Sequence, residues 1–189
     1  MYISPINIMK GLHAVLEANR EQIDRVIKHY RSKDSLSIFD GLRKTLPESA
    51  YPSLELDPVS ASVEWTHTEA QTGEYQIECY LTLKNSNEEY AAEYVSEVTR
   101  SILKVLNYPD NMCFQIPNEY YQTDEPDKPF KYPIFIQFGN VASVNYRNTI
   151  DGSLTVAMFT WSGRVLEYFD YQGDGPHKIT WKTDYLHEG

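Results

Sequence analysis

The chain has 189 residues, of which 27 are acidic and 17 basic, so its formal net charge is −10. This length suits one core, and we expect a single domain over residues 1–189. The acidic balance repels phosphate, which argues against sequence-independent DNA binding and against adsorption to anionic membranes.

The cysteines and the N-terminus favour a cytoplasmic chain without disulfides. Cys79 and Cys113 are not spaced as CxxC, and Cys79 falls among the apolar residues of a predicted strand. The first residues lack the basic and apolar regions of a secretory signal, and no apolar run is long enough to span a membrane. We therefore expect a soluble chain that is assembled in the cytoplasm.

Two helices are predicted at the start of the chain. Ser4 is a suitable cap, Pro5 suits the first helical position, and apolar residues recur on one stripe as far as Tyr30. This pattern predicts a helix over residues 5–31. A shorter helical pattern follows over residues 35–46 and stops at Pro47, although Gly41 weakens it.

The middle of the chain predicts a hairpin and a covering helix. Apolar residues alternate over 53–66 and 74–84, and the polar residues between them predict an antiparallel turn. A symmetric hairpin would place Trp65 opposite Ile77 and Val63 opposite Cys79. Ser86 and Glu89 form a capping box before the apolar run from Ala91 to Leu106, so a second main helix is expected there, ended by Asn107 and Pro109.

The remaining sequence predicts a long loop, a second hairpin and a C-terminal arm. Residues 107–133 contain five prolines and an acidic run, which predict a surface loop. Strands are expected from 134 towards 146 and from 154, with a turn at Asp151 and Gly152. The break at 173–176 isolates an arm at 173–189. The fold class is therefore α+β, with a mixed, mainly antiparallel sheet of two hairpins flanked by two main helices, in α-β-β-α-β-β order.

Residue types offer little support for catalysis, a metal or a cofactor. Glu64 and Glu78 are expected to oppose each other on the polar face of the first hairpin, yet no histidine or aspartate is expected beside them. The five histidines are scattered, and no nucleotide-binding glycine motif or nucleophile elbow is present. A calcium site in the acidic run 123–127 is disfavoured because Pro126 interrupts it. We expect no enzyme activity, no cofactor and no metal.

Aromatic and apolar residues outside the expected core indicate a contact surface. The second face of the second hairpin is also apolar in part, so a partner chain is one candidate to cover it. Exposed tyrosines make good interface anchors, although packing against the domain's own core is an equal alternative. The predicted subunit or tail interface consists of Tyr120, Tyr121, Phe135, Phe159, Trp161, Ile179 and Trp181.

The element order, the stretch from Tyr51 to Leu56, the helix from Ala91 to Leu106 and the strands from Val144 to Trp161 resemble tail terminator proteins of tailed bacteriophages. The resemblance covers roughly residues 6–165. It implies a structural virion protein of the tail and neck: a homo-hexameric ring that caps the tail tube, ends tail assembly and joins the tail to the head. Its partners would be the tail tube protein, neck or connector proteins and, in a contractile tail, the sheath protein.

A ring through which DNA passes without specific binding benefits from carboxylates that repel phosphate. Glu55, Glu64 and Glu78 are the residues that we expect to line such a channel. The alternatives are another head–tail connector, such as a stopper or head completion protein, a small acidic immunity protein that binds a basic toxin, or an enzyme.

Overall fold

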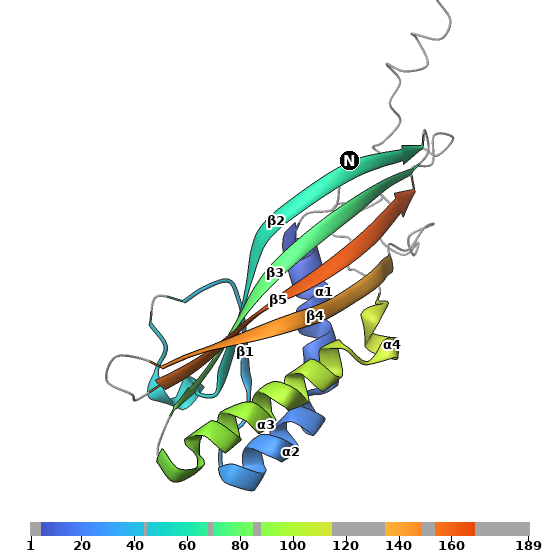
Figure 1. Cartoon of the computed structure of the whole chain (residues 1–189). Coiled ribbons are helices and arrows are strands. Elements are labelled where there is room, and N and C mark those ends of the chain that lie inside the picture. The colour runs from blue at the N-terminus through green and yellow to red at the C-terminus, as the bar shows by residue number, and fades with distance from the viewer. Residues whose placement is uncertain are drawn as a thin grey trace, which may run out of the picture.

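A five-stranded sheet with helices packed against it is the main feature of the computed structural model (Figure 1). The structure describes residues 5–43, 45–67, 70–84, 88–114, 135–148 and 154–168. Its elements, in chain order, are α1 (Pro5–Ala18), α2 (Arg20–Tyr30), β1 (Ser37–Asp40), the 3-10 helix η1 (Glu48–Ala50), β2 (Ser53–His67), β3 (Ala70–Lys84), α3 (Glu88–Leu106), α4 (Pro109–Met112), β4 (Phe135–Asn148) and β5 (Leu154–Tyr168).

The sheet has the order β1-β2-β3-β5-β4 and is built from the two predicted hairpins. β2 pairs with β3 and β4 pairs with β5, both antiparallel, and β3 pairs with β5 to join the hairpins. The short β1 adds a parallel strand beside β2. The α+β class and the mixed, mainly antiparallel sheet are therefore confirmed.

The core lies between one face of the sheet and the helices. α1 packs on β1, β2 and β3, whereas α3 packs on β4 and β5, and α2 packs against α3. In the view of Figure 1 the strands cross in front of α1, so the face turned to the reader is the one that α1 leaves uncovered. Burial of each large apolar side chain stabilises the fold by about 1.5–3 kcal/mol. The fully buried aliphatic residues include Ile8, Leu12, Leu16, Ile23, Ile27, Leu54, Leu56, Ile77, Leu81, Val98 and Ile102.

The predicted first helix is interrupted at Asn19, which separates α1 from α2. The Asn19 side chain donates to the Val15 carbonyl at 2.9 Å, and its backbone N–H bonds to Leu16 at 3.2 Å. Asparagine side chains compete in this way for backbone groups and favour helix ends. The apolar stripe does not reveal the break, because Leu16 and Ile23 are seven residues apart and fall on the same face of an uninterrupted helix.

The helix predicted over residues 35–46 is wrong, since residues 37–40 form β1. Gly41 follows with a φ of 79°, a left-handed conformation that ends the regular backbone, and its N–H bonds to the Leu56 carbonyl at 2.7 Å. Phe39 and Leu42 therefore belong to an edge strand and its turn, where their helical spacing is coincidental.

The predicted register of the first hairpin is also wrong. Cys79 pairs with Leu56 and Ile77 with Pro58, while Val63 lies opposite Gly73 and Trp65 opposite Gln71. The polar residues expected in a wide turn instead extend β3 back to Ala70, so two residues separate the strands. A register shift follows Pro58, which lacks the N–H that a regular ladder requires.

Part of the predicted loop 107–133 is helical, because Pro109–Met112 form α4. Its remainder from residue 115, the cap at Ser86, the turn at Asp151 and Gly152, and the arm at 173–189 lie outside the described residues. The strands predicted from 134 and from 154 are confirmed as β4 and β5.

The indole of Trp161 fills the space that two paired glycines leave open. Gly139 and Gly163 face each other across β4 and β5, and a Cβ on either would lie 2.1 Å from the indole. We expect Gly139→Ala to lower the free energy of unfolding by about 1–3 kcal/mol, because overpacking displaces the ring or the strand. Urea denaturation measures this loss. Ser162→Ala, at an exposed position of β5, is the control and should change it by less than about 0.5 kcal/mol.

Candidate assembly surface

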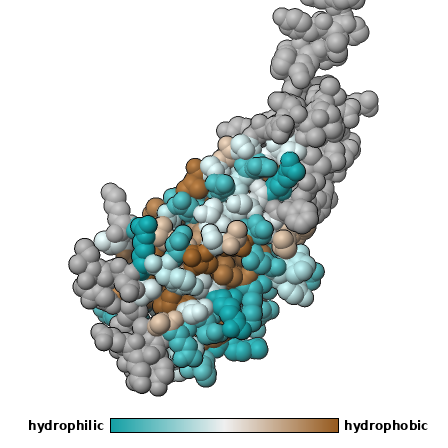
Figure 2. Space-filling view, viewed as in Figure 1, coloured by the Kyte–Doolittle hydropathy of each residue, from teal (hydrophilic) through white to brown (hydrophobic). Residues whose placement is uncertain are grey.

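The sheet face opposite the core is a mixed polar and apolar surface. Along β3, Glu74, Gln76, Glu78 and Tyr80 alternate with the buried residues Tyr75, Ile77, Cys79 and Leu81. On β5, Val156 and Met158 occupy the same face and are half-buried. Figure 2 shows hydrophobic side chains gathered across the middle of this view, with the polar surface of the helices below them. Such a surface offers both apolar area and hydrogen-bonding groups to a partner.

Two carboxylates meet on this face, though not the predicted pair. Glu78 lies opposite Asp57, whereas Glu64 pairs with Thr72, so the expected opposition of Glu64 and Glu78 is wrong. The Tyr80 hydroxyl donates a hydrogen bond to the Glu78 carboxylate. This bond, followed by burial and by the charges of Glu78 and Asp57, raises the pKa of Tyr80 from 10.0 to about 12.

The Tyr80 contact has a measurable dependence on pH. Because the pKa of Tyr80 is raised, its contribution to stability is complete below pH 10.0 and is lost as the pH rises towards about 12. Glu78→Gln is expected to bring the pKa of Tyr80 back towards its ordinary value. The difference in phenolate absorbance between each protein and its Tyr80→Phe counterpart isolates this titration. An unchanged midpoint would show that Glu78 is not the cause.

Glu55 is not placed to line a channel. Its side chain is buried, with 8% exposure, and its carboxylate accepts the backbone N–H of Arg43 at 2.6 Å. The carboxylate thereby holds the chain that follows β1 against the sheet. Of the three predicted lining residues, Glu78 is half-buried on the open face, and the side chain of Glu64 lies outside the described residues.

The predicted aromatic interface is corrected at two positions. Phe159 and Trp161 are 3% and 1% exposed and belong to the core between sheet and helices, so they offer no outer contact surface. Phe135 lies in β4, but its side chain is outside the described residues. Tyr120, Tyr121, Ile179 and Trp181 lie outside them entirely and stay predictions.

β4 forms one edge of the sheet and carries a feature that the sequence did not indicate. Asn107, at the end of α3, accepts the Val141 N–H at 2.9 Å and donates to the Val141 carbonyl at 3.1 Å. Beyond this point Ala142, Ser143, Asn145, Tyr146 and Arg147 are exposed. In the sequence, Asn107 followed by Pro109 indicates only the end of a helix. Its hydrogen bonds to Val141 of β4 could not be predicted from that pattern.

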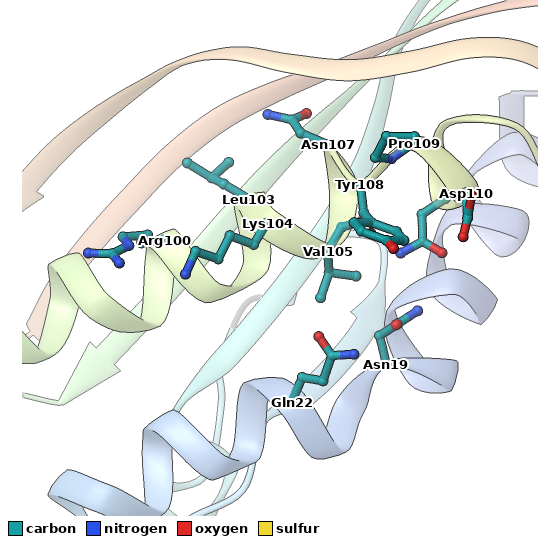
Figure 3. Close-up of a pocket in the computed structure, with 11 residues that line it drawn as sticks. Asn19, Gln22, Arg100, Leu103, Lys104, Val105, Asn107, Tyr108, Pro109 and Asp110 are labelled. Atoms are coloured by element: carbon teal, nitrogen blue, oxygen red, sulfur yellow. Dashed lines mark hydrogen bonds between the residues drawn. The ribbon is translucent and has the colours of Figure 1, made fainter.

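A groove of about 840 Å³ lies where α2, α3 and α4 meet (Figure 3). Figure 3 shows Gln22 of α2 and Asn19 on one side and Val105 and Tyr108 on the other. Arg100 and Lys104 add positive charge to an otherwise acidic chain, although Arg100 is paired with Glu97 at 3.1 Å. The lining is open and mixes amide, charged and apolar side chains, which suits a protein contact better than an enclosed small ligand.

The described ranges contain neither a cluster of metal-ligating side chains nor a helix suited to a membrane. No group of three or more histidine, cysteine, aspartate or glutamate side chains is arranged there to hold a metal ion. His13 contacts Asp40 at 2.7 Å and Glu17 at 3.7 Å, which ties α1 to β1. None of the described helices has both the length and the apolar character needed to cross a membrane.

Comparison with known proteins identifies the fold rather than a family. The sequence matches no protein-family profile, and no curated protein matches it. A chain from the virion of a native gene transfer agent particle shares the fold, with a TM-score of 0.51 and 8% sequence identity, over 84% of this chain and 94% of that chain. A second solved structure matches with a TM-score of 0.38 and 10% identity, over 79% of this chain and 96% of that chain.

Proposed function

We propose that this chain is a structural virion protein of the tail terminator type, acting at the junction between tail and head. The observation that carries the proposal is the fold shared with a chain of a gene transfer agent virion, because the likeness extends over 94% of that chain. The resemblance in element order to phage tail terminators points to the same class. In this role the chain acts by assembly and needs no catalysis, cofactor or metal.

The described surfaces are suited to ring assembly. A closed ring built from one repeated contact needs two different faces on each subunit. The β5 side of the open sheet face offers Val156 and Met158, whereas the groove beside α3 offers Arg100 and Lys104. These faces differ in chemistry, because the first is apolar and the second is polar and carries positive charge. A homo-hexamer formed through such contacts would cap the tail tube and present a surface to the neck proteins.

The exposed part of β4 offers a further contact for a tail protein. An edge strand can accept an added strand from another chain through backbone hydrogen bonds. In a contractile tail this partner would be the sheath protein, and the accessible stretch begins after Val141. Exposed Tyr146 provides an aromatic anchor beside it.

Carboxylates on the open face are candidates for the wall of a DNA channel, with Asp57 and Glu78 in place of the pair expected from sequence. We expect Glu78→Lys to slow DNA ejection while leaving the protein folded, because the positive charge attracts phosphate. Ejection kinetics of virions carrying the variant provide the measurement. Glu21→Lys makes the same charge change at an exposed position of α2 and is the control. Equal ejection rates in both variants and wild type would remove the channel assignment.

The mass of the protein alone, and with tubes assembled from its cognate tail tube protein, tests the proposed role. The expected result is a hexamer at tube ends, with tube growth stopped, measured by light scattering and negative-stain microscopy at one protein concentration. Binding at the portal side instead would indicate a stopper or head completion protein. A monomer with no affinity for tubes would contradict the proposal and favour a small acidic binding protein.

A further inference from the structure

The edge of the sheet at β4 is covered in one place by a side chain that imitates a strand. Val141 presents both of its backbone groups to Asn107, which accepts from the N–H at 2.9 Å and donates to the carbonyl at 3.1 Å. A primary amide has the same donor and acceptor as a peptide group. Asn107 therefore makes the paired bonds that a residue of a neighbouring strand would make.

The position of Asn107 fixes where this cover lies. Its backbone N–H bonds to Leu103 at 2.9 Å, so the residue continues the last turn of α3, whose Val105 and Leu106 are buried in the core. A side chain on such a rigid base loses little freedom when it binds the strand. The resulting contact is part of the folded domain and is present before any partner arrives.

The sequence of β4 supplies few of the residues that usually protect an edge strand. From residue 135 to 148, β4 contains no proline and no lysine, and Arg147 is its single charged residue. Ala142, Ser143, Asn145 and Tyr146 are exposed. A register shift between Val141 and Val144 interrupts the ladder with β5 and disturbs the strand at this point. Edge strands of this kind pair readily with copies of themselves unless they are blocked.

We propose that Asn107 is an edge guard: by occupying Val141, it prevents β4 from pairing with β4 of a second copy. The occupant follows from the sequence of the strand. In an antiparallel pair of β4 strands centred on Val141, Tyr146 lies opposite Ile136 and Arg147 opposite Phe135, so no like charges meet. Asn107 takes the backbone bonds of the central Val141 pair, so this pairing cannot form while Asn107 is in place. Removing the guard opens the middle of the strand to a second copy.

Alanine at Asn107 tests the guard directly. Asn107→Ala is expected to increase concentration-dependent self-association over wild type by about tenfold or more, since the loss of each hydrogen bond frees backbone groups for a partner. Sedimentation velocity over a concentration series measures the association. Asn111→Ala is the matched control, because the Asn111 amide bonds to Val105 of α3 at 2.8 Å. It removes a hydrogen bond of the same kind from the same region and should leave association unchanged.

A second substitution identifies the surface that associates. Adding Tyr146→Lys to Asn107→Ala places a charge on the exposed edge and should return association to the wild-type level. If the alanine variant does not fold, Asn107→Asp retains the acceptor for the Val141 N–H, loses the donor, and should show an intermediate increase. Wild-type association in folded Asn107→Ala and Asn107→Asp would overturn the proposal, as would equal association in Asn111→Ala. These comparisons are relative to wild type and do not depend on whether the chain caps a tail.

Discussion

Alanine in place of Trp161 is expected to lower the free energy of unfolding by about 3–5 kcal/mol, the range for truncating a buried large aromatic side chain. Trp161 is 1% exposed, contacts the Phe114 ring at a centroid distance of 6.0 Å, and lies over the Gly139–Gly163 pair. The two glycines cannot move side chains into the space, because they have none. The cavity therefore persists, and urea denaturation should report a loss near the upper end of the range.

The same variant separates a core role from an interface role for this residue. Tyr146→Ala on β4 removes an aromatic ring that is 52% exposed and should cost less than about 1 kcal/mol. If Trp161→Ala kept wild-type stability but abolished assembly, the residue would act at an interface after all. The structure instead leads us to expect that Trp161→Ala impairs assembly only because less of the protein is folded. The midpoint of urea unfolding measures this loss of stability.

The difficulty in assigning Trp161 from sequence lies in β5 itself. Val156 and Met158 alternate with Ala157, Phe159 and Trp161, so both faces of the strand are apolar. Alternation identifies a strand and divides its residues into two faces, but it does not say which face the helices cover. That choice depends on the long-range pairing of β5 with β3 and on the packing of α3, which no local pattern contains.

Local sequence patterns predicted the helices and strands whose boundaries are set by their own residues. The apolar stripe from Ala91 to Leu106 predicted α3, and alternation predicted β2, β3, β4 and β5. The failures have two causes, which are contacts with distant parts of the chain and local bonds that leave the apolar pattern unchanged. Gly41 reads as a weak point in a helix until its N–H is seen bonded to Leu56, and the break at Asn19 leaves the apolar stripe unchanged.

The sequence predicted the acidic nature of the candidate assembly surface but not which residues are neighbours on it. An acidic sheet face was expected, and Glu78 lies on it, but Asp57 rather than Glu64 is its neighbour because only two residues separate β2 from β3, so the turn comes earlier in the chain than predicted. Asn107 is 34 residues from Val141 in the chain, so its contact with the edge strand depends on how α3 crosses the sheet. Side-chain mimicry of a strand has no sequence signature of its own.

The second large effect is expected at Asp24, whose carboxylate fastens α2 to the start of β1. It is 8% exposed, accepts the Leu36 N–H at 2.8 Å and the Ser35 hydroxyl at 2.6 Å, and lies 3.8 Å from the Arg20 guanidinium. Asp24→Ala leaves a buried N–H without an acceptor and removes the negative charge beside Arg20. We expect it to lower the free energy of unfolding by about 2–4 kcal/mol.

Two further variants distinguish this fastening from a general effect of charge. Asp24→Asn retains one oxygen acceptor and should lose about half as much stability, whereas Glu21→Ala, at an exposed position of the same helix, should stay within about 0.5 kcal/mol of wild type. Hydrogen exchange at the Leu36 amide gives a local readout, because loss of the acceptor exposes this N–H first. Slow exchange at Leu36 in a stable Asp24→Ala variant would mean that β1 is held by its pairing with β2 alone.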